Sequence, residues 1–426
     1  MRNRIIAFVK EPTSLHVIIN TFGNYLNVFF IAFFALIMFR NMTPSDYGMF
    51  SVLLGISYVL AQILEFGTTA TIYSSVPVLY GADEKGLYRF LKSTFFYQTF
   101  FSVIIITALL LSFPFLDAKF FKTGAPNWIL TMTGLTVIMF IWQNFLTNIL
   151  FAAKRFFRAN IYLNAANIGK AFVMIILAYT GNLTVATVIM TYGFIGPLIF
   201  FILFLIKNYE RIPSVRKAEI HRDEVKFGYT VTYFAASQFY NVGLRMDLFL
   251  MSFFGLGAAV GYYASAQKII LSIVATIVSI SQVLSPQFAA ITTRFEAIKL
   301  IKKGLLYMLI PCGIFVALFL TPKFIFELVL TDSFAPGIAV TRMLAFPFMI
   351  SALATVTMLF LLYTVKKPIY ILISNIAFFI IVSFGSYYLI PIQGMFGPPI
   401  AITAGFIVAL GIQIIGLVKE IKLLKN

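Results

Sequence analysis

The sequence has few of the residue types that soluble enzymes use for chemistry. Its 426 residues include one cysteine and two histidines, and only 11% of them are charged. Cys312 lies in an apolar run, and His16 and His221 are far apart, so neither a disulfide framework nor a metal cluster is predicted. The sequence contains no phosphate-binding loop of the GxxxxGK[ST] type and no credible Ser/His/Asp arrangement. It therefore predicts a protein that is not an enzyme and needs no cofactor.

Because polar residues are scarce, the solvent around most of the chain must be lipid. Hydrophobic residues make up 61% of the sequence, and the mean hydropathy is +0.95. A soluble domain of this size could not cover so much apolar surface. Backbone groups in lipid must be hydrogen-bonded internally, which leaves helices or a closed barrel. Apolar runs of about 20 residues without two-residue alternation exclude a barrel, so we predict an all-α integral membrane protein.

Acidic residues are also few, and the basic residues lie in short loops between apolar runs. There are 32 lysines and arginines against 15 acids, giving a net charge of +17. This distribution is a topology signal and does not indicate a nucleic-acid partner. The predicted helices are about 13–39, 47–78, 93–115, 127–152, 159–180, 183–206, 227–253, 259–290, 304–320, 340–364, 368–390 and 400–418. They place 24 of the 32 basic residues inside, which predicts twelve transmembrane helices with both termini cytoplasmic.

A polar segment and a weak internal repeat divide the chain into halves. Gly48-Met-Phe and Gly261-Tyr-Tyr lie 213 residues apart, and a Tyr-x-x-x-x-Asn-Ile pattern recurs at Asn167 and Asn375. Because each half has an even number of helices, the halves have the same orientation, which predicts two six-helix bundles around a central cavity. The predicted parts are an N-terminal bundle over 1–206, a cytoplasmic linker over 207–226 and a C-terminal bundle over 227–426.

Three basic residues lie inside the predicted helices. A charge at the centre of a membrane helix costs at least about 2.5–3.5 kcal/mol, so it must face protein or water. At about 1.5 Å per residue, Lys170 lies roughly 16 Å deep, and Arg245 and Lys268 lie roughly 12–14 Å deep. Snorkelling to the membrane surface could serve Arg245 or Lys268, but it would serve Lys170 poorly. We predict that all three cations line the cavity.

Two acidic residues have both a structural and a functional interpretation. Asp247 either neutralises Lys268 or Arg245 as an ion pair or titrates as a coupling group. Arg245 and Asp247 are two residues apart, so on a regular helix their side chains do not face each other. Glu65 is either an acid at the membrane interface or a second coupling group. The sequence leaves these alternatives open.

Amide side chains recur in the predicted membrane helices. Asn20, Asn24 and Asn27 are spaced to share one helix face, and Asn144 and Asn167 lie in two further helices. Such amides either hydrogen-bond neighbouring helices or contact a sugar. We include Asn24, Asn144 and Asn167 among the predicted substrate-binding residues.

Two segments of the sequence carry recognisable motifs. The first segment runs from Ile37 to Gly67, and the second runs from Arg245 to Lys268. The motif positions in the first segment are Pro44, Tyr47, Gly48, Phe50, Glu65 and Gly67. These segments resemble motifs of the Wzx-type polysaccharide flippases, which belong to the multidrug/oligosaccharidyl-lipid/polysaccharide (MOP) exporter superfamily. The resemblance covers essentially the whole chain and implies a V-shaped cavity that opens to each membrane face in turn.

The resemblance implies a substrate as well as a fold. It implies transport of a polyprenyl-pyrophosphate-linked oligosaccharide, such as an O-antigen unit of lipopolysaccharide, across the bacterial cytoplasmic (inner) membrane. Membrane lipids and polysaccharide polymerase machinery are the implied partners, and a proton or sodium ion is the candidate coupling ion. Arginine and lysine bind phosphate strongly where the dielectric constant is low, so the basic cavity favours an anionic head group.

Other interpretations of the sequence remain. A cation-coupled, MATE-like exporter of small molecules is the first alternative, although a cationic drug would need an acidic cavity. A MurJ-type lipid II flippase is the second, although such proteins usually have two more helices. A polymerase or membrane glycosyltransferase is disfavoured because the predicted outer segments are short.

Overall fold

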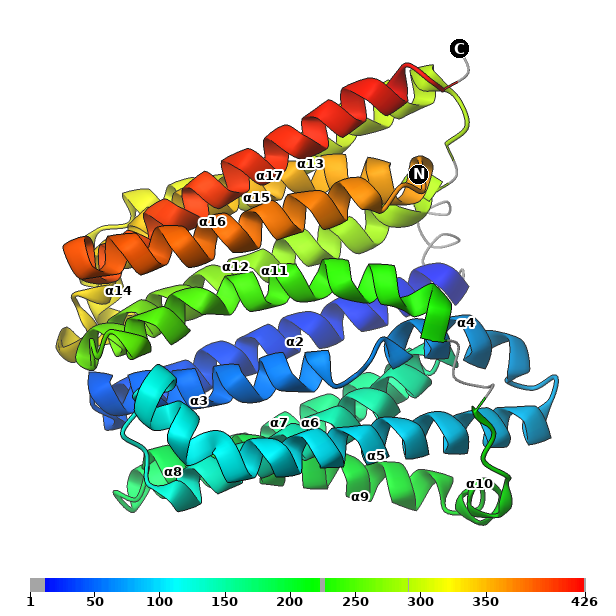
Figure 1. The fold of residues 1–426 in the computed structure, drawn as a ribbon, viewed down its shortest axis with the longest axis horizontal. Helices are drawn as coiled ribbons and strands as arrows, with labels where there is room; N and C mark the ends of the chain where they lie inside the picture. The colour runs from blue at the N-terminus through cyan, green and yellow to red at the C-terminus, as the bar shows by residue number, and fades with distance from the viewer. Residues whose placement is uncertain (1–11, 223–226, 290, 425–426) are drawn as a thin grey trace, which may run out of the picture. The chain divides into compact units, whose positions relative to one another are not determined.

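The chain folds into helices joined by short turns (Figure 1). The computed structural model describes residues 12–222, 227–289 and 291–424. These residues belong to two compact units. Unit 1 consists of Met1–Ile37, Ile56–Pro114 and Pro126–Val231, and unit 2 consists of Met38–Gly55, Phe115–Ala125 and Thr232–Asn426. The division into 1–206, 207–226 and 227–426 stays a prediction.

The helices of the first half of the chain include three pairs that meet without a loop. They are α2 (Pro12–Asn41), α3 (Pro44–Ile63), α4 (Thr68–Leu79), α5 (Glu84–Leu116), the π-helix η1 (Asp117–Phe121), α6 (Asn127–Ala152), α7 (Phe156–Tyr179), α8 (Val185–Met190), the π-helix η2 (Thr191–Ile195), α9 (Gly196–Asn208) and α10 (Ile212–Lys217). Within unit 1, α7 packs along α9 and α6 packs along α4. Of the predicted site residues, Asn144 lies on α6, and Asn167 and Lys170 lie on α7.

The second half begins with a helical hairpin. Its helices are α11 (Phe227–Phe253), α12 (Ala258–Ala289), α13 (Arg294–Leu320), α14 (Lys323–Leu330), the 3-10 helix η4 (Asp332–Phe334), α15 (Gly337–Leu359), the π-helix η5 (Phe360–Thr364), α16 (Ile369–Gln393), the 3-10 helix η6 (Gly394–Phe396) and α17 (Gly397–Ile421). The predicted turn between α11 and α12 is confirmed, with Gly255 and Gly257 at φ 72° and 43°. In unit 2, α15 packs against α12, α13 and α17.

Many helix faces carry apolar side chains outward. On α9, Leu198, Ile202 and Leu205 are exposed on one face, and on α13 Leu306 and Ile310 are exposed. Exposed apolar stripes of this length are typical of lipid-facing helices. The protein is therefore a multi-pass membrane protein.

Helix length and hydropathy together identify candidate membrane crossings. In the described part of the chain, nine ranges are long and apolar enough to cross a membrane. One of these, Ile369–Ile421, holds both α16 and α17, whereas α2 contributes only the shorter apolar range Tyr25–Asn41. The predicted twelve helices and the cytoplasmic position of both termini stay predictions.

The single helix predicted over 47–78 is wrong, because the structure breaks it into α3 and α4. The break contains Phe66 at φ 48° and Gly67 at φ 73°, both in the left-handed region. Glycine adopts this region without the steric cost that a Cβ atom brings. Glu65 lies directly before these residues. A broken helix at membrane depth frees backbone groups and is typical of ion and substrate sites in transporters.

A contact between α3 and α12, made within unit 2, joins the two positions of the internal repeat. A Cβ atom at Gly48 would come within 2.8 Å of the Gly261 nitrogen and 3.3 Å of the Gly257 oxygen. A Cβ atom at Gly261 would overlap the carbonyl group of Pro44. Because Pro44 and Gly257 are also 213 residues apart, the contact is reciprocal, as it would be across a two-fold axis. Only glycine at these positions lets the two backbones come so close.

Candidate functional site

Arg245 and Asp247 belong to one hydrogen-bonded network in unit 2. Nη1 of Arg245 donates to Oε1 of Gln267 over 3.2 Å, and Nε2 of Gln267 donates to Oδ2 of Asp247 over 2.9 Å. Gln267 thus bridges the basic and the acidic side chain. Asp247 is fully buried and also accepts hydrogen bonds from the Tyr263 hydroxyl at 2.6 Å and from the Leu248 amide at 2.7 Å. This network fixes the position of a guanidinium on α11.

The sequence signals did not identify Gln267 and Tyr263. Both lie on α12, and their spacing of four residues places them on the same helix face. Lys268 follows Gln267 and therefore points about 100° away around the helix. Its side chain is half-buried, and among the described residues its ammonium has no hydrogen bond or ion pair. The structure thus joins Arg245 to Asp247 through a neutral amide, while Lys268 lies beside that network.

Lys170 lies against two aromatic rings of unit 1. Its Nζ is 5.4 Å from the centre of the Phe34 ring and 5.2 Å from the centre of the Tyr192 ring. A cation over an aromatic ring is stabilised by about 0.5 to 2 kcal/mol. The stem of Lys170 packs on Gly196, where a Cβ atom would lie 2.9 Å from the lysine Cδ. The ammonium therefore lies beside rings of α2 and η2, and the stem of the side chain packs on α9.

Glu65 and Asn144 contact each other at the break between α3 and α4. Nδ2 of Asn144 donates to Oε1 of Glu65 over 3.0 Å, and the Thr69 hydroxyl donates to Oε2 over 2.8 Å. Asn148 in turn donates to the Thr69 hydroxyl over 2.8 Å. Two predicted site residues thus share one network, and within the described part of the chain the Glu65 carboxylate accepts hydrogen bonds from neutral donors alone. Such a carboxylate can gain or lose a proton without breaking an ion pair.

The other predicted asparagines lie along α2 and α7. Nδ2 of Asn167, which is buried, donates to Oδ1 of Asn27 over 2.9 Å. This bond joins α2 and α7, in line with the prediction that such amides hydrogen-bond neighbouring helices. The side chain of Asn24 lies outside the described residues, so its predicted contact with substrate stays untested.

Unit 2 contains a cavity of about 430 Å³ among α11, α12, α15, η5, α16 and α17. Its polar lining residues are Ser237, Tyr240, Asn241, Ser281, Ser285, Ser351, Thr355, Tyr363, Asn375 and Gln413. None of the described residues that line it is charged. Hydroxyls, amides and aromatic rings together match the chemistry of a sugar, which has both hydrogen-bonding edges and apolar faces.

The polar lining of this cavity corresponds to a spacing pattern in the sequence. Three helices each carry two polar side chains four residues apart, at 237 and 241, 281 and 285, and 351 and 355. This spacing places each pair on one helix face. Arg245 lies four residues after Asn241 on α11, so it continues the spacing of positions 237 and 241. It therefore lies one turn, about 6 Å along the helix, from a cavity-lining amide.

Comparison with known proteins establishes the family. A family model described as polysaccharide biosynthesis protein matches residues 37–339. This protein therefore belongs to the polysaccharide biosynthesis protein family, as the two motif segments predicted. None of the curated protein sequences matches this chain.

Solved structures of low sequence identity share the fold. A lipid II flippase MurJ in an inward closed conformation matches 95% of this chain and 87% of its own, with a TM-score of 0.72 and 14% identity. An inward-facing MATE family multidrug transporter of the MOP superfamily matches 95% and 98%, with a TM-score of 0.73 and 14% identity. The MATE multidrug transporter DinF-BH matches 96% and 96%, with a TM-score of 0.67 and 14% identity. The predicted MOP fold is confirmed.

Proposed function

We propose that this protein flips a polyprenyl-pyrophosphate-linked oligosaccharide across the cytoplasmic membrane by alternating access. The observation that carries the proposal is the position of Arg245, which Gln267 holds one helical turn from an uncharged polar cavity. A guanidinium forms strong paired hydrogen bonds with phosphate oxygens where water is excluded. Arg245 would bind the pyrophosphate, and the cavity of unit 2 would take sugar residues.

The other predicted residues complete this proposal. Lys170 and Lys268 would add positive charge along the path of the head group, and Asn24, Asn144 and Asn167 would offer amides to sugars. The polyprenyl tail would stay in the bilayer, so the protein has to shield only the polar part of the substrate. Among the described residues, the unit 2 cavity has no carboxylate in its lining, which disfavours a MATE-like exporter of cationic drugs.

Purified protein in vesicles gives the direct test of transport. A polyprenyl-pyrophosphate-linked saccharide is placed in both leaflets, and an impermeant glycosidase is added outside. With active protein, the inner-leaflet substrate becomes exposed, and the whole pool is cleaved. Without protein, the inner pool should remain protected. Protection that persists with folded protein present would contradict the proposal.

Replacing Lys170 by methionine separates charge from packing. The methionine stem fills the space beside Gly196 and keeps contact with the Phe34 and Tyr192 rings, so the fold should be retained. Loss of one phosphate-binding cation should slow flipping at least about tenfold. Lys170→Arg keeps the charge and is the matched control. If Lys170→Met flips substrate at the rate of the unmodified protein, Lys170 has no part in substrate binding.

Glu65 is the proposed coupling acid, and Glu65→Gln tests this role. Glutamine retains an oxygen to accept from Asn144 or Thr69, but it cannot exchange a proton or bind a sodium ion as a carboxylate does. A proton or sodium gradient should then no longer accelerate flipping, whereas substrate binding and thermal stability should change little. Asn148→Ala, one step further out in the network, should keep the gradient effect. A full gradient effect in Glu65→Gln would exclude Glu65 as the coupling group.

A further inference from the structure

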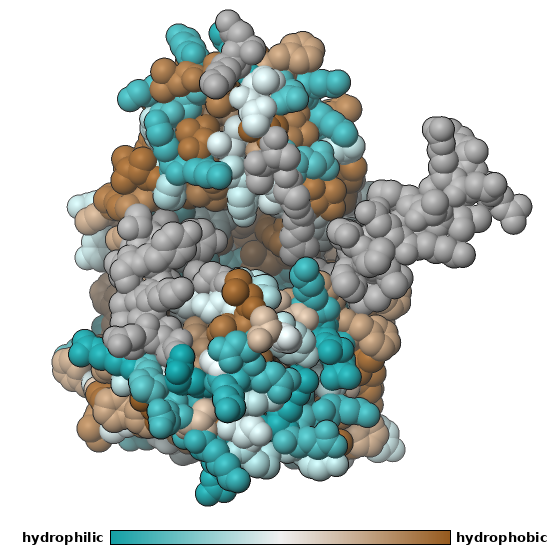
Figure 2. All heavy atoms as spheres, turned by 90° about the vertical axis from the view of Figure 1, so that its right-hand side faces the viewer, coloured by the Kyte–Doolittle hydropathy of each residue, from teal (hydrophilic) through white to brown (hydrophobic). Residues whose placement is uncertain are grey.

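A second cavity, of about 630 Å³, lies in unit 1 and has a basic rim. It lies where α4, α6 and α9 end and where α5 and α10 begin. Hydrophilic side chains gather at this end of unit 1, in the lower part of the view in Figure 2. The predicted topology places this end in the cytoplasm.

The cavity combines an apolar interior with positive charge. Leu87, Leu91 and Phe95 recur every four residues along α5 and form one apolar wall, and Leu146 and Ile149 of α6 form another. The basic residues around it are Lys92, Arg155, Arg158, Lys207, Arg211 and Arg216, and the acidic residue that lines it is Glu210. A basic cavity between membrane helices on the cytoplasmic side is typical of sites for lipid head groups.

Two of the arginines converge on one phenol oxygen. Nη2 of Arg155 and Nη1 of Arg211 donate to the Tyr80 hydroxyl over 3.1 and 3.3 Å. Their guanidinium carbons lie 5.8 and 5.6 Å from the Tyr80 ring centre. Among the described residues, neither arginine forms an ion pair with a carboxylate. Each guanidinium has five N–H donors, so most remain available to an anion that would relieve the repulsion between the two charges.

The ionisation of Tyr80 reflects the same concentration of positive charge. Burial alone raises the pKa of this phenol, but hydrogen bonds from Arg211 and Arg155, together with their charges, outweigh burial and lower the pKa. Tyr80 lies between α4 and α5, outside the predicted membrane core. The electrostatic potential at this position therefore favours an anion.

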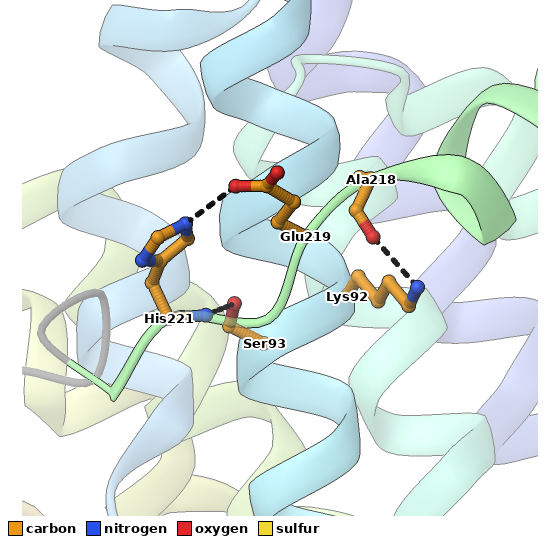
Figure 3. Close-up of polar contacts among 5 residues, drawn as sticks. All are labelled: Lys92, Ser93, Ala218, Glu219 and His221. Carbon is orange, nitrogen blue, oxygen red and sulfur yellow. Dashed lines mark hydrogen bonds and ion pairs between the residues drawn. The ribbon is translucent and has the colours of Figure 1, made fainter.

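The wall formed by α10 is fixed to α5 (Figure 3). Nζ of Lys92 donates to the carbonyl oxygens of Arg216 and Ala218 over 2.7 and 2.6 Å. The His221 amide donates to the Ser93 hydroxyl over 2.9 Å. Lys92 is thus used to hold the wall, while Arg155 and Arg211 remain directed at Tyr80. Three hydrogen bonds therefore hold the segment 216–221 against α5 at this cavity.

The rim of the cavity has the character of a membrane interface. Ile206 and Tyr209, which flank the lining residues Lys207 and Asn208, are 61% and 66% exposed. Tyrosines and basic residues beside apolar side chains are typical of the zone where lipid head groups meet acyl chains. A soluble phosphate would contact only the basic rim and not the apolar walls. A phospholipid would contact both, the rim with its phosphate and the walls with its acyl chains.

We propose that this cavity binds an anionic phospholipid of the cytoplasmic leaflet. The phosphodiester lies between Arg155 and Arg211. The part of an acyl chain nearest the head group lies against the α5 and α6 walls. This site is separate from the proposed transport residues, so it does not depend on the proposed function. A lipid bound there would hold the ends of α4, α6 and α9 together on the cytoplasmic side.

The test compares lipid binding by matched variants of the full-length protein. Phosphatidylglycerol and phosphatidylcholine are titrated separately into detergent-purified protein, and binding is followed by native mass spectrometry and thermal unfolding. We expect phosphatidylglycerol to bind the unmodified protein at least about tenfold more tightly than phosphatidylcholine. In the Arg155→Gln/Arg211→Gln double variant this preference should vanish.

Two controls make the outcome decisive. Lys299→Gln/Lys302→Gln removes the same charge from exposed positions on α13 and should keep the full preference. Arg155→Lys/Arg211→Lys keeps the charge and should keep most of the preference for phosphatidylglycerol. An unchanged circular dichroism spectrum shows that each variant is folded. The proposal is overturned if the double glutamine variant keeps the preference. It is also overturned if inorganic phosphate alone, without lipid, stabilises the unmodified protein as much as phosphatidylglycerol does. Because no flipping is measured, a failure here leaves the proposed function untouched.

Discussion

Replacing Arg245 by alanine is expected to abolish surface glycan in cells that depend on this protein. Lipid-linked repeat units should accumulate on the cytoplasmic leaflet, because the substrate's pyrophosphate loses its proposed ligand. A hydrogen bond to a charged group is worth about 1.5–3 kcal/mol, so losing two of them should slow transport more than about a hundredfold. The measurements are surface-glycan staining and labelling of lipid-linked units in each leaflet.

Two further variants at the same network show whether Arg245 binds substrate or only supports the fold. Arg245→Lys keeps a cation beside Gln267 and should restore part of the export. Gln267→Leu removes the amide that holds Arg245 and bridges it to Asp247, so it should weaken export although the guanidinium itself is retained. If the repeat units of the Arg245→Ala strain reach the outer leaflet unpolymerised, flipping is intact and the proposed function is wrong.

The second large effect is expected at Gly261, where α12 meets α3. A valine there would place two carbon branches against the carbonyl group of Pro44, and backbone atoms cannot move aside as a flexible side chain can. Forcing atoms into a packed contact costs about 1–3 kcal/mol, and more when the backbone must shift. Gly261→Val should therefore lower the yield of monodisperse protein and its midpoint of thermal unfolding.

Glycines elsewhere in the helices provide the matched control for this prediction. Gly313 on α13 and Gly411 on α17 have open space where a Cβ atom would lie. Gly313→Ala and Gly411→Ala should be neutral or stabilise the helix by up to about 1 kcal/mol. A Gly261→Val protein as stable as these two variants would show that the helices separate at no cost.

Hydropathy predicted the fold class well, because lipid leaves helices as the structure that this composition can form. It predicted helix ends less well. The predicted start at 93 is wrong, because α5 begins at Glu84 and carries Lys85, Arg89 and Lys92 within the helix. Charged residues mark where a helix leaves the apolar zone, whereas the hydrogen-bonded backbone continues into the water. The break at Phe66 and Gly67 was missed for a different reason, since a single glycine inside an apolar run is common in unbroken membrane helices.

The candidate site residues were easiest to single out from the sequence where they carry charge. Arg245, Asp247 and Glu65 stand out because an ionised group in lipid is costly, and the structure places each of them in a hydrogen-bonded network. Gln267 has no charge, so hydropathy and charge count could not distinguish it from an ordinary polar helix residue. Its role depends on which face of α12 meets α11, which is a property of tertiary packing. The same holds for the serine pairs that line the unit 2 cavity.

The reciprocal contact of Gly48 and Gly261 bears on the ancestry of the chain. Gly48 and Gly261 occupy the same position of the repeat, 213 residues apart. Gly48 approaches Gly257, and Gly261 approaches Pro44, which is the residue that corresponds to Gly257. A surface of this kind is complementary to itself. The same contact could therefore form between two identical shorter polypeptides. A homodimer of half-length polypeptides, if later joined by gene fusion, would have possessed this glycine contact from the start, and divergence of the two copies needed only to leave it unchanged.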